Sequence, residues 1–169
     1  STSYASDGAA SLYFYSTTTL YALATSQALD LTTFTANSLH LTFKARKTAA
    51  AYGRLDVGIM TNPEDLNTLT VLKSIYPSDY ATTTSWYSFD IPLTEAYENG
   101  NVYLAFYTPN GASSYIYLDD ISLDYQPECS APTNLTVSNI AGSSALVSWT
   151  PAIYGATDYM VEYSEAGMD

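Results

Sequence analysis

The sequence has little cysteine, little basic charge and little charge of any kind. Its single cysteine, Cys129, cannot form a disulfide within this stretch. Lys and Arg number 5 among 169 residues, against 17 Asp and Glu, so the formal net charge is −12 at pH 7. An acidic surface repels phosphate groups, which argues against nucleic-acid binding and against anionic membrane surfaces. Divalent cations and neutral polar ligands remain compatible with this charge.

Long apolar runs and catalytic residues are scarce as well. No stretch approaches the roughly 20 apolar residues of a membrane-spanning helix, so we expect no membrane insertion. His40 is the only histidine and lies in an alternating stretch, while Cys129 has no CxxC partner or neighbouring base. Asp119 and Asp120 are adjacent in the sequence, so their side chains diverge instead of flanking a glycosidic bond. We therefore predict that the chain is not an enzyme.

Tyrosine, in contrast, is abundant. The chain has 17 tyrosines and 47% hydrophobic residues, but only 13% charged residues. Its polar surface must therefore consist largely of hydroxyl groups. Because Tyr and Thr favour the half-buried surface of a pleated sheet, the composition points to an all-β protein.

Alternating apolar and polar residues predict a series of strands. The clearest is 38–47, in which Leu39, Leu41, Phe43 and Ala45 form one face and polar residues form the other. Further strands are predicted over residues 11–16, 20–25, 54–61, 69–76, 86–93, 101–108 and 115–125. Turn signals such as Asn99-Gly100 separate them, and no helical period is convincing. About eight strands in this arrangement predict a β-sandwich or jelly roll.

Two segments carry a resemblance to a known family. LDVGIMTNPEDLNTLTVL, residues 55–72, and YLDDISL, residues 117–123, resemble the MAM-like and cleaved-adhesin-like jelly-roll domains of Bacteroidetes-type surface proteins. The resemblance covers about residues 5–125 and implies an extracellular or bacterial cell-surface location. Such domains usually begin with an additional strand that carries an acidic residue and a tryptophan. Nothing before Ser11 supplies that strand, so we expect it to be missing or to come from another chain.

The sequence changes character at Gln126. Residues 129–137, 144–151 and 158–164 resemble the first three strands of a fibronectin type III domain, with Pro132 before the first strand and Trp149 in the second. Such a sandwich needs about 100 residues. We therefore predict a jelly-roll domain over residues 1–126, followed over residues 127–169 by a truncated fibronectin type III domain.

The acidic pair Asp119-Asp120 divides the strand predicted at 115–125. The apolar positions change parity across the pair, which indicates a β-bulge. Calcium binds carboxylate oxygens, and the resemblance to carbohydrate-binding jelly rolls implies a structural calcium site at the position of Asp119. Asp7, in a Ser-Asp-Gly turn, is the best local partner, so the predicted metal ligands are Asp7, Asp119 and Asp120. The alternative is that the acidic pair only accepts hydrogen bonds from loop N–H groups at a kink.

Six tyrosines lie opposite the apolar residues of their predicted strands. If these strands are neighbours, the tyrosines cover one outer face of a sheet and are candidate ligand-binding residues. Aromatic faces stack on sugar rings and also make protein interfaces. The structural alternative is aromatic pairing between strands. The six residues are Tyr13, Tyr15, Tyr103, Tyr107, Tyr115 and Tyr117.

These observations predict a non-catalytic extracellular adhesion or binding module within a larger, secreted multidomain surface protein. Its ligand would be a glycan or a protein, and its one possible cofactor would be structural calcium. The alternative is a structural subunit or spacer of an extracellular fibre, assembled with copies of itself by strand or domain complementation.

Overall fold

The computed structural model describes residues 4–31, 34, 38–48, 52–93, 101–127, 131–152, 156 and 158–163. The chain divides into two compact units, Ser1–Tyr125 and Gln126–Asp169, one residue away from the predicted domain boundary. Regular structure in the described residues is almost entirely β, which confirms the predicted all-β class. The described helices are two single 3₁₀ turns, η1 (Leu66–Thr68) and η2 (Pro77–Asp79), and none of them is long enough to cross a membrane.

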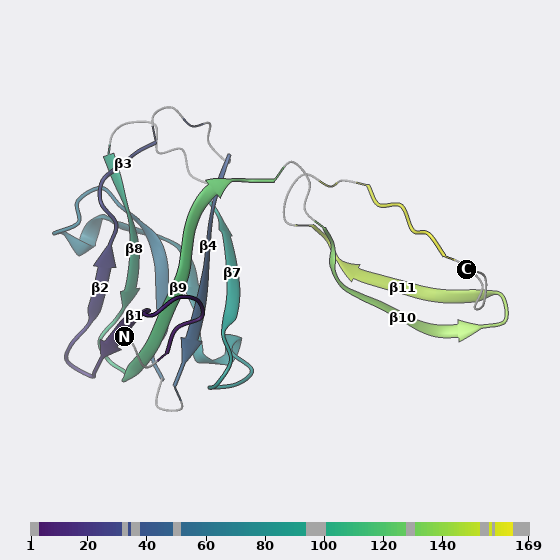
Figure 1. Cartoon of the computed structure of the whole chain (residues 1–169), viewed down its shortest axis with the longest axis horizontal. Coiled ribbons are helices and arrows are strands. Elements are labelled where there is room, and N and C mark those ends of the chain that lie inside the picture. The colour runs from purple at the N-terminus through teal and green to yellow at the C-terminus, as the bar shows by residue number, and fades with distance from the viewer. Residues whose placement is uncertain are drawn as a thin grey trace. The chain divides into compact units, whose positions relative to one another are not determined.

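The first unit contains two antiparallel sheets (Figure 1). The first sheet has the order β1-β9-β4-β7 and is made of β1 (Leu12–Ser16), β9 (Ser114–Tyr125), β4 (Leu39–Lys47) and β7 (Tyr87–Pro92). The second has the order β2-β8-β5-β6, with β3 (Leu29–Asp30) also paired to β8. Its other strands are β2 (Ala22–Thr25), β8 (Asn101–Thr108), β5 (Leu55–Met60) and β6 (Leu69–Ile75). β3 and the two 3₁₀ turns are too short to show a period and were not predicted.

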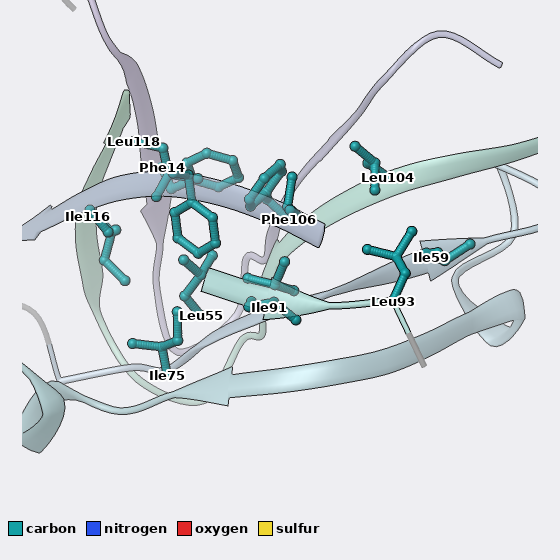
Figure 2. Packing of buried hydrophobic residues seen from close by; sticks show 14 of the residues in the cluster. Phe14, Leu55, Ile59, Ile75, Ile91, Leu93, Leu104, Phe106, Ile116 and Leu118 are labelled. Carbon is teal, nitrogen blue, oxygen red and sulfur yellow. The ribbon is translucent and has the colours of Figure 1, made fainter. Parts of the chain in front are cut away.

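The core lies between the two sheets and is built from the inward-facing residues of both (Figure 2). On β4, the predicted inward residues Leu39, Leu41, Phe43 and Ala45 are all buried. The inner face of β5 supplies Leu55, Val57 and Ile59. Burying each large apolar side chain contributes about 1.5–3 kcal/mol, so this cluster is the main stabilising feature of the sandwich.

β9 has the bulge that the change of parity predicts. Thr42 of β4 pairs with Ser122, whereas Lys44 pairs with Asp119, so two steps along β4 correspond to three along β9. Asp120 adopts the left-handed backbone conformation, with φ of 52°, which Asp tolerates better than most residues. The extra residue reverses which alternate residues of β9 face the core, and this confirms the predicted β-bulge at the acidic pair.

The second unit contains a hairpin of β10 (Thr133–Ala141) and β11 (Ser144–Thr150). The strand predicted at 158–164 is wrong for its described residues, 158–163, which form no strand. The physical reason is that a segment of alternating apolar and polar residues forms a strand only where a neighbouring strand offers backbone hydrogen bonds. No described strand pairs with this segment. The assignment to a fibronectin type III domain stays a prediction. Asn99-Gly100 and Cys129 lie outside the described residues.

Candidate binding face

Four of the six predicted tyrosines meet on the outer surface of the first sheet. β1 pairs with β9 so that Tyr13 lies opposite Tyr117 and Tyr15 opposite Tyr115. The rings of Tyr13 and Tyr117 stack with centroids 4.8 Å apart, and those of Tyr15 and Tyr115 lie 5.1 Å apart. Tyr13 and Tyr15 are each 45% exposed. We call these four residues the tyrosine face.

Two hydroxyls of the tyrosine face, those of Tyr13 and Tyr115, remain protonated at neutral pH. Burial and the neighbouring tyrosines raise the pKa of Tyr13, and a hydrogen bond with Tyr15 raises the pKa of Tyr115. Both values move upward from an ordinary value that already lies near 10. Tyr13 and Tyr115 therefore present uncharged rings whose hydroxyl groups can donate and accept hydrogen bonds.

Tyr117 is covered by a residue that periodicity did not single out. The ring of Tyr4 meets Tyr117 edge-on at 5.0 Å, and the guanidinium of Arg46 lies 4.0 Å from the centroid of Tyr4. Tyr117 is consequently only 9% exposed and presents little surface to a ligand. We call residues 4–10, which cross this part of the sheet, the strap. An isolated aromatic residue in an irregular segment has no periodic context, so the sequence carried no signal for Tyr4.

Tyr103 and Tyr107 do not join the other four tyrosines. Both lie on β8, in the second sheet, whereas the tyrosine face belongs to the first sheet. Tyr107 instead packs against Tyr21, with centroids 5.8 Å apart. The expectation of one continuous face of six tyrosines is therefore corrected to two separate aromatic surfaces, because β1 and β9 pair with each other and not with β8.

The strap is held to the sheet by Asp119. One carboxylate oxygen, Oδ2, accepts hydrogen bonds from the backbone N–H groups of Ser6, at 2.7 Å, and Asp7, at 3.3 Å. The other, Oδ1, accepts one from the N–H of Asp120 at 3.0 Å. Burial opposes ionisation, but these three donors and the charge of Lys44 outweigh it and lower the pKa of Asp119. Asp119 therefore stays ionised and fixes a loop that is distant in sequence.

The three predicted metal ligands do not converge. Asp119 faces N–H donors, Asp120 pairs with Lys44 Nζ at 2.8 Å, and Asp7 accepts a hydrogen bond from the N–H of Gly8 at 2.7 Å. Across the described ranges, no three His, Cys, Asp or Glu residues are grouped as they would be to hold a metal ion. These residues do not fit a calcium site, and their contacts favour the alternative of capping at a kink. Calcium binding stays a prediction.

Replacing Asp119 with alanine is expected to release the strap and lower the free energy of unfolding by about 1–2 kcal/mol, because three N–H groups lose a charged acceptor. Urea denaturation of the variant and of the matched Asp124→Ala variant checks this. Asp124 lies on the same strand and accepts a hydrogen bond from the side chain of Ser122. We expect Asp124→Ala to change the free energy by less than about 0.5 kcal/mol. Equal effects of the two variants would contradict the role of Asp119.

The contribution of Asp119 should depend on pH in a defined direction. Because its pKa is lowered in the folded state, its stabilising effect is complete above the unfolded value near 3.8 and is lost as pH falls through the folded pKa. The wild type should therefore lose its advantage over Asp119→Ala in acid, which urea denaturation at several pH values measures.

Thermal melting curves of the wild type and of Asp119→Ala, recorded with calcium and with chelator, test the predicted metal site. A rise with calcium that Asp119→Ala removes would support calcium, and identical curves would end that prediction.

A groove lies on the first sheet beside the tyrosine face, and Phe43 and Phe89 line it together with polar residues. It has a volume of about 420 Å³, and its polar lining is shared by β4, β7 and the bulge of β9. Its charged groups are paired: Lys44 with Asp120, and His40 Nδ1 with Asp90 Oδ1 at 2.9 Å. On β4, Lys44 lies two residues from Arg46, which pairs with Tyr117, so the groove and the tyrosine face adjoin. The polar residues that line the groove are Thr42, Lys44, Ser88, Asp90 and Asp120.

Comparison with known proteins shows the fold alone. No family model and no curated protein matches the sequence. A family 30 carbohydrate-binding module of a cellulosomal cellulase from Clostridium thermocellum is 16% identical, with a TM-score of 0.50 over 73% of this chain and 79% of that chain. A cleaved adhesin domain of Lys-gingipain from Porphyromonas gingivalis is 18% identical, with a TM-score of 0.45 over 62% and 63% of the two chains. A family 11 carbohydrate-binding module from C. thermocellum is 16% identical, with a TM-score of 0.44 over 69% and 75%. The first of these likenesses agrees with the predicted β-sandwich.

Proposed function

We propose that the first unit is a non-catalytic binding module that takes a neutral saccharide chain on the outer surface of its first sheet. One observation carries the proposal: two half-exposed rings, Tyr13 and Tyr15, stand side by side on β1 next to a groove lined with polar groups. Sugars present apolar C–H faces and hydroxyl edges. An aromatic ring suits the first, and a surface of hydroxyl, carboxylate and ammonium groups suits the second.

The charge of the groove favours a neutral ligand. Lys44 faces the carboxylate of Asp120 and His40 faces that of Asp90, so neither side chain offers an uncompensated positive charge. The net charge of −12 would further repel an anionic polymer. Sugar hydroxyls, in contrast, can both donate to carboxylates and accept from ammonium groups. Paired charges of this kind therefore suit an uncharged polyhydroxyl ligand.

The arrangement of the strands favours a chain longer than one sugar. β1 and β4 lie on either side of β9, two strand spacings or about 10 Å apart. Tyr15 pairs with Tyr115, whereas Lys44 pairs with Asp119, four residues further along β9, so Tyr15 and Lys44 are about 16 Å apart. A ligand that uses both the rings and the groove must span this distance. An oligosaccharide that passes over the strap, which covers Tyr117 and Asp119 of β9, would do so, whereas a single sugar ring would reach one part.

The fold is compatible with this role. The family 30 module that shares it is, by its name, a carbohydrate-binding module of a cellulosomal cellulase. We extend to this chain the role of a binding module at the cell surface or in the extracellular space, within a larger protein. Adhesion is the biological function that such a module would serve.

The test is to replace the exposed rings. Tyr13→Ala and Tyr15→Ala are each expected to weaken binding of a neutral oligosaccharide, found on a glycan array and measured by calorimetry, by about tenfold, or 1.4 kcal/mol. Tyr103→Ala is the matched control, since Tyr103 lies on the other sheet. Because the removed rings are half exposed, melting temperatures should change little. Unchanged binding by the Tyr13 and Tyr15 variants, or no array signal for any neutral glycan, would refute the proposal.

Self-assembly is a second candidate, favoured by the hairpin of the second unit. Four large apolar residues there are more than half exposed, which is unusual for a stable surface. Sedimentation of the proteins prepared for the array distinguishes the two functions. Ordered polymers would support a fibre subunit, and a strictly monomeric protein would count against it. The residues are Leu135, Val137, Ile140 and Leu146.

A further inference from the structure

The second sheet has a buried carboxylate on its outer face. Asp56 of β5 pairs across the sheet with Tyr107 of β8 and with Ser74 of β6, yet it is only 2% exposed. Arg54 Nε donates to both of its oxygens, at 2.8 and 2.9 Å, and Ser74 Oγ donates to Oδ1 at 2.6 Å. A buried charge is stable only when it is paired and hydrogen-bonded in this way. Asp56 therefore fixes the position of Arg54.

Arg54 has donor capacity that Asp56 does not use. Both hydrogen bonds to Asp56 come from Nε, and within the described residues Nη1 and Nη2 have no hydrogen bond or ion pair. The side chain is 45% exposed. A guanidinium presents its terminal N–H groups as a planar fork that matches the two oxygens of a carboxylate. Because the side chain is already immobilised, little conformational entropy is lost when a ligand binds.

Tyrosines lie in the neighbourhood of this guanidinium. Tyr107 lies opposite Asp56, and its pKa is raised by burial and by the carboxylate of Asp56, while Arg54 opposes the increase. Tyr21 packs against Tyr107, and Tyr76, which follows β6, also interacts electrostatically with Arg54. Tyr21 and Tyr76 are at least half exposed. A ligand held by Arg54 would therefore rest its apolar parts against tyrosine rings.

We propose that Arg54, oriented by Asp56 next to Tyr107, is a binding site for a carboxylate group on the outer face of the second sheet. The site is separate from the tyrosine face and does not depend on the function proposed for it. A monoanionic carboxylate suits the single oriented fork. A phosphate, with more charge, would be repelled by the acidic surface. The carboxylate can belong to an acidic sugar or to the C-terminus of a peptide.

The competing explanation is that Arg54 only neutralises Asp56. The two explanations differ in what a lysine would do. Lysine keeps the positive charge that Asp56 needs but lacks the planar fork. Arg54→Lys should therefore retain folding, whereas it should lose the geometry that a carboxylate ligand requires. The matched control is Arg46→Lys on the first sheet, which changes the same residue type away from the site.

The experiment is an NMR titration of the full chain with galacturonate, which carries one carboxylate, and with its methyl ester. A second arm uses a short peptide with a free C-terminus and the same peptide amidated. We expect a free-carboxylate probe to shift amides of β5, β6 and β8, and its neutral counterpart to leave them unchanged. Arg54→Lys should weaken that binding at least tenfold with an unchanged melting temperature, while Arg46→Lys and Tyr15→Ala should bind as the wild type does.

Each result is decisive. Binding of galacturonate alone identifies an acidic saccharide, binding of the peptide alone identifies a C-terminus, and either supports the carboxylate site. Equal binding by Arg54→Lys and the wild type would overturn the site, because simple charge would then suffice. Absence of shifts with both carboxylate probes would overturn it too. Since Tyr15→Ala tests the other sheet, failure here leaves the saccharide proposal intact, and the reverse also holds.

Discussion

Replacing Phe43 with alanine is expected to lower the free energy of unfolding of the first unit by about 3–5 kcal/mol. Phe43 is 2% exposed at the centre of β4. Its ring stacks on Phe89 of β7 at 5.3 Å and meets Phe106 of β8 edge-on at 5.4 Å. Phe89 belongs to the same sheet and Phe106 to the opposite one. The variant therefore loses contacts within a sheet and between the sheets, and leaves a cavity between them.

The measurement is urea denaturation followed by circular dichroism, with Phe43→Leu as the matched variant. Leucine keeps much of the volume and should cost at most about 2 kcal/mol. Because domains of this size are commonly only 5–15 kcal/mol stable, the alanine variant should also lose ligand binding at moderate temperature. A loss below about 1 kcal/mol for Phe43→Ala would show that the two sheets do not pack through this ring.

The importance of Phe43 could be predicted from sequence alone. It lies in the middle of a stretch that alternates over nine residues, and a strand with one buried face leaves that pattern. The bulge in β9 was predictable for a related reason, since one extra residue reverses the alternation. Both features are local. Each is encoded within a single strand and requires no knowledge of the neighbouring strand.

The candidate sites were less predictable because they depend on which strands meet. Alternation shows that Tyr107 and Tyr115 face outward, but it does not show that β8 and β9 lie in different sheets. Burial of Asp56 on the outer face of β5 was likewise not signalled, since its partners, Arg54 and Ser74, converge only once β5 and β6 pair. Pairing between distant strands is a tertiary property, which a period of two does not encode.

Replacing Gly58 with alanine is expected to cost about 3 kcal/mol, the upper end of the range for overpacking. An added Cβ would lie 2.1 Å from the carbonyl oxygen of Thr70 and 3.0 Å from the Cα of Val71. Both atoms are backbone, so no side-chain rotation relieves the contact. They come this close because the pairing of β5 with β6 shifts by one residue between Val57 and Gly58. The expected result is displacement of β6 from β5.

The matched control is Gly8→Ala in the strap. Gly8 has φ of 64°, but an added Cβ would meet no atom within 4 Å. Alanine there should cost about 1–2 kcal/mol through backbone strain, without crowding. Denaturation curves measure both variants, and equal costs would show that crowding at Gly58 is unimportant.

The Gly58 variant also connects stability to the two proposed sites. Ser74 of β6 donates to Asp56, which in turn orients Arg54, so displacement of β6 should weaken carboxylate binding on the second sheet. Tyr13 and Tyr15 lie on β1, which pairs with β9 and not with β6. In Gly58→Ala protein that remains folded, saccharide binding should therefore persist. Loss of both activities together would mean that the two sheets deform as one body and that the sites are not independent.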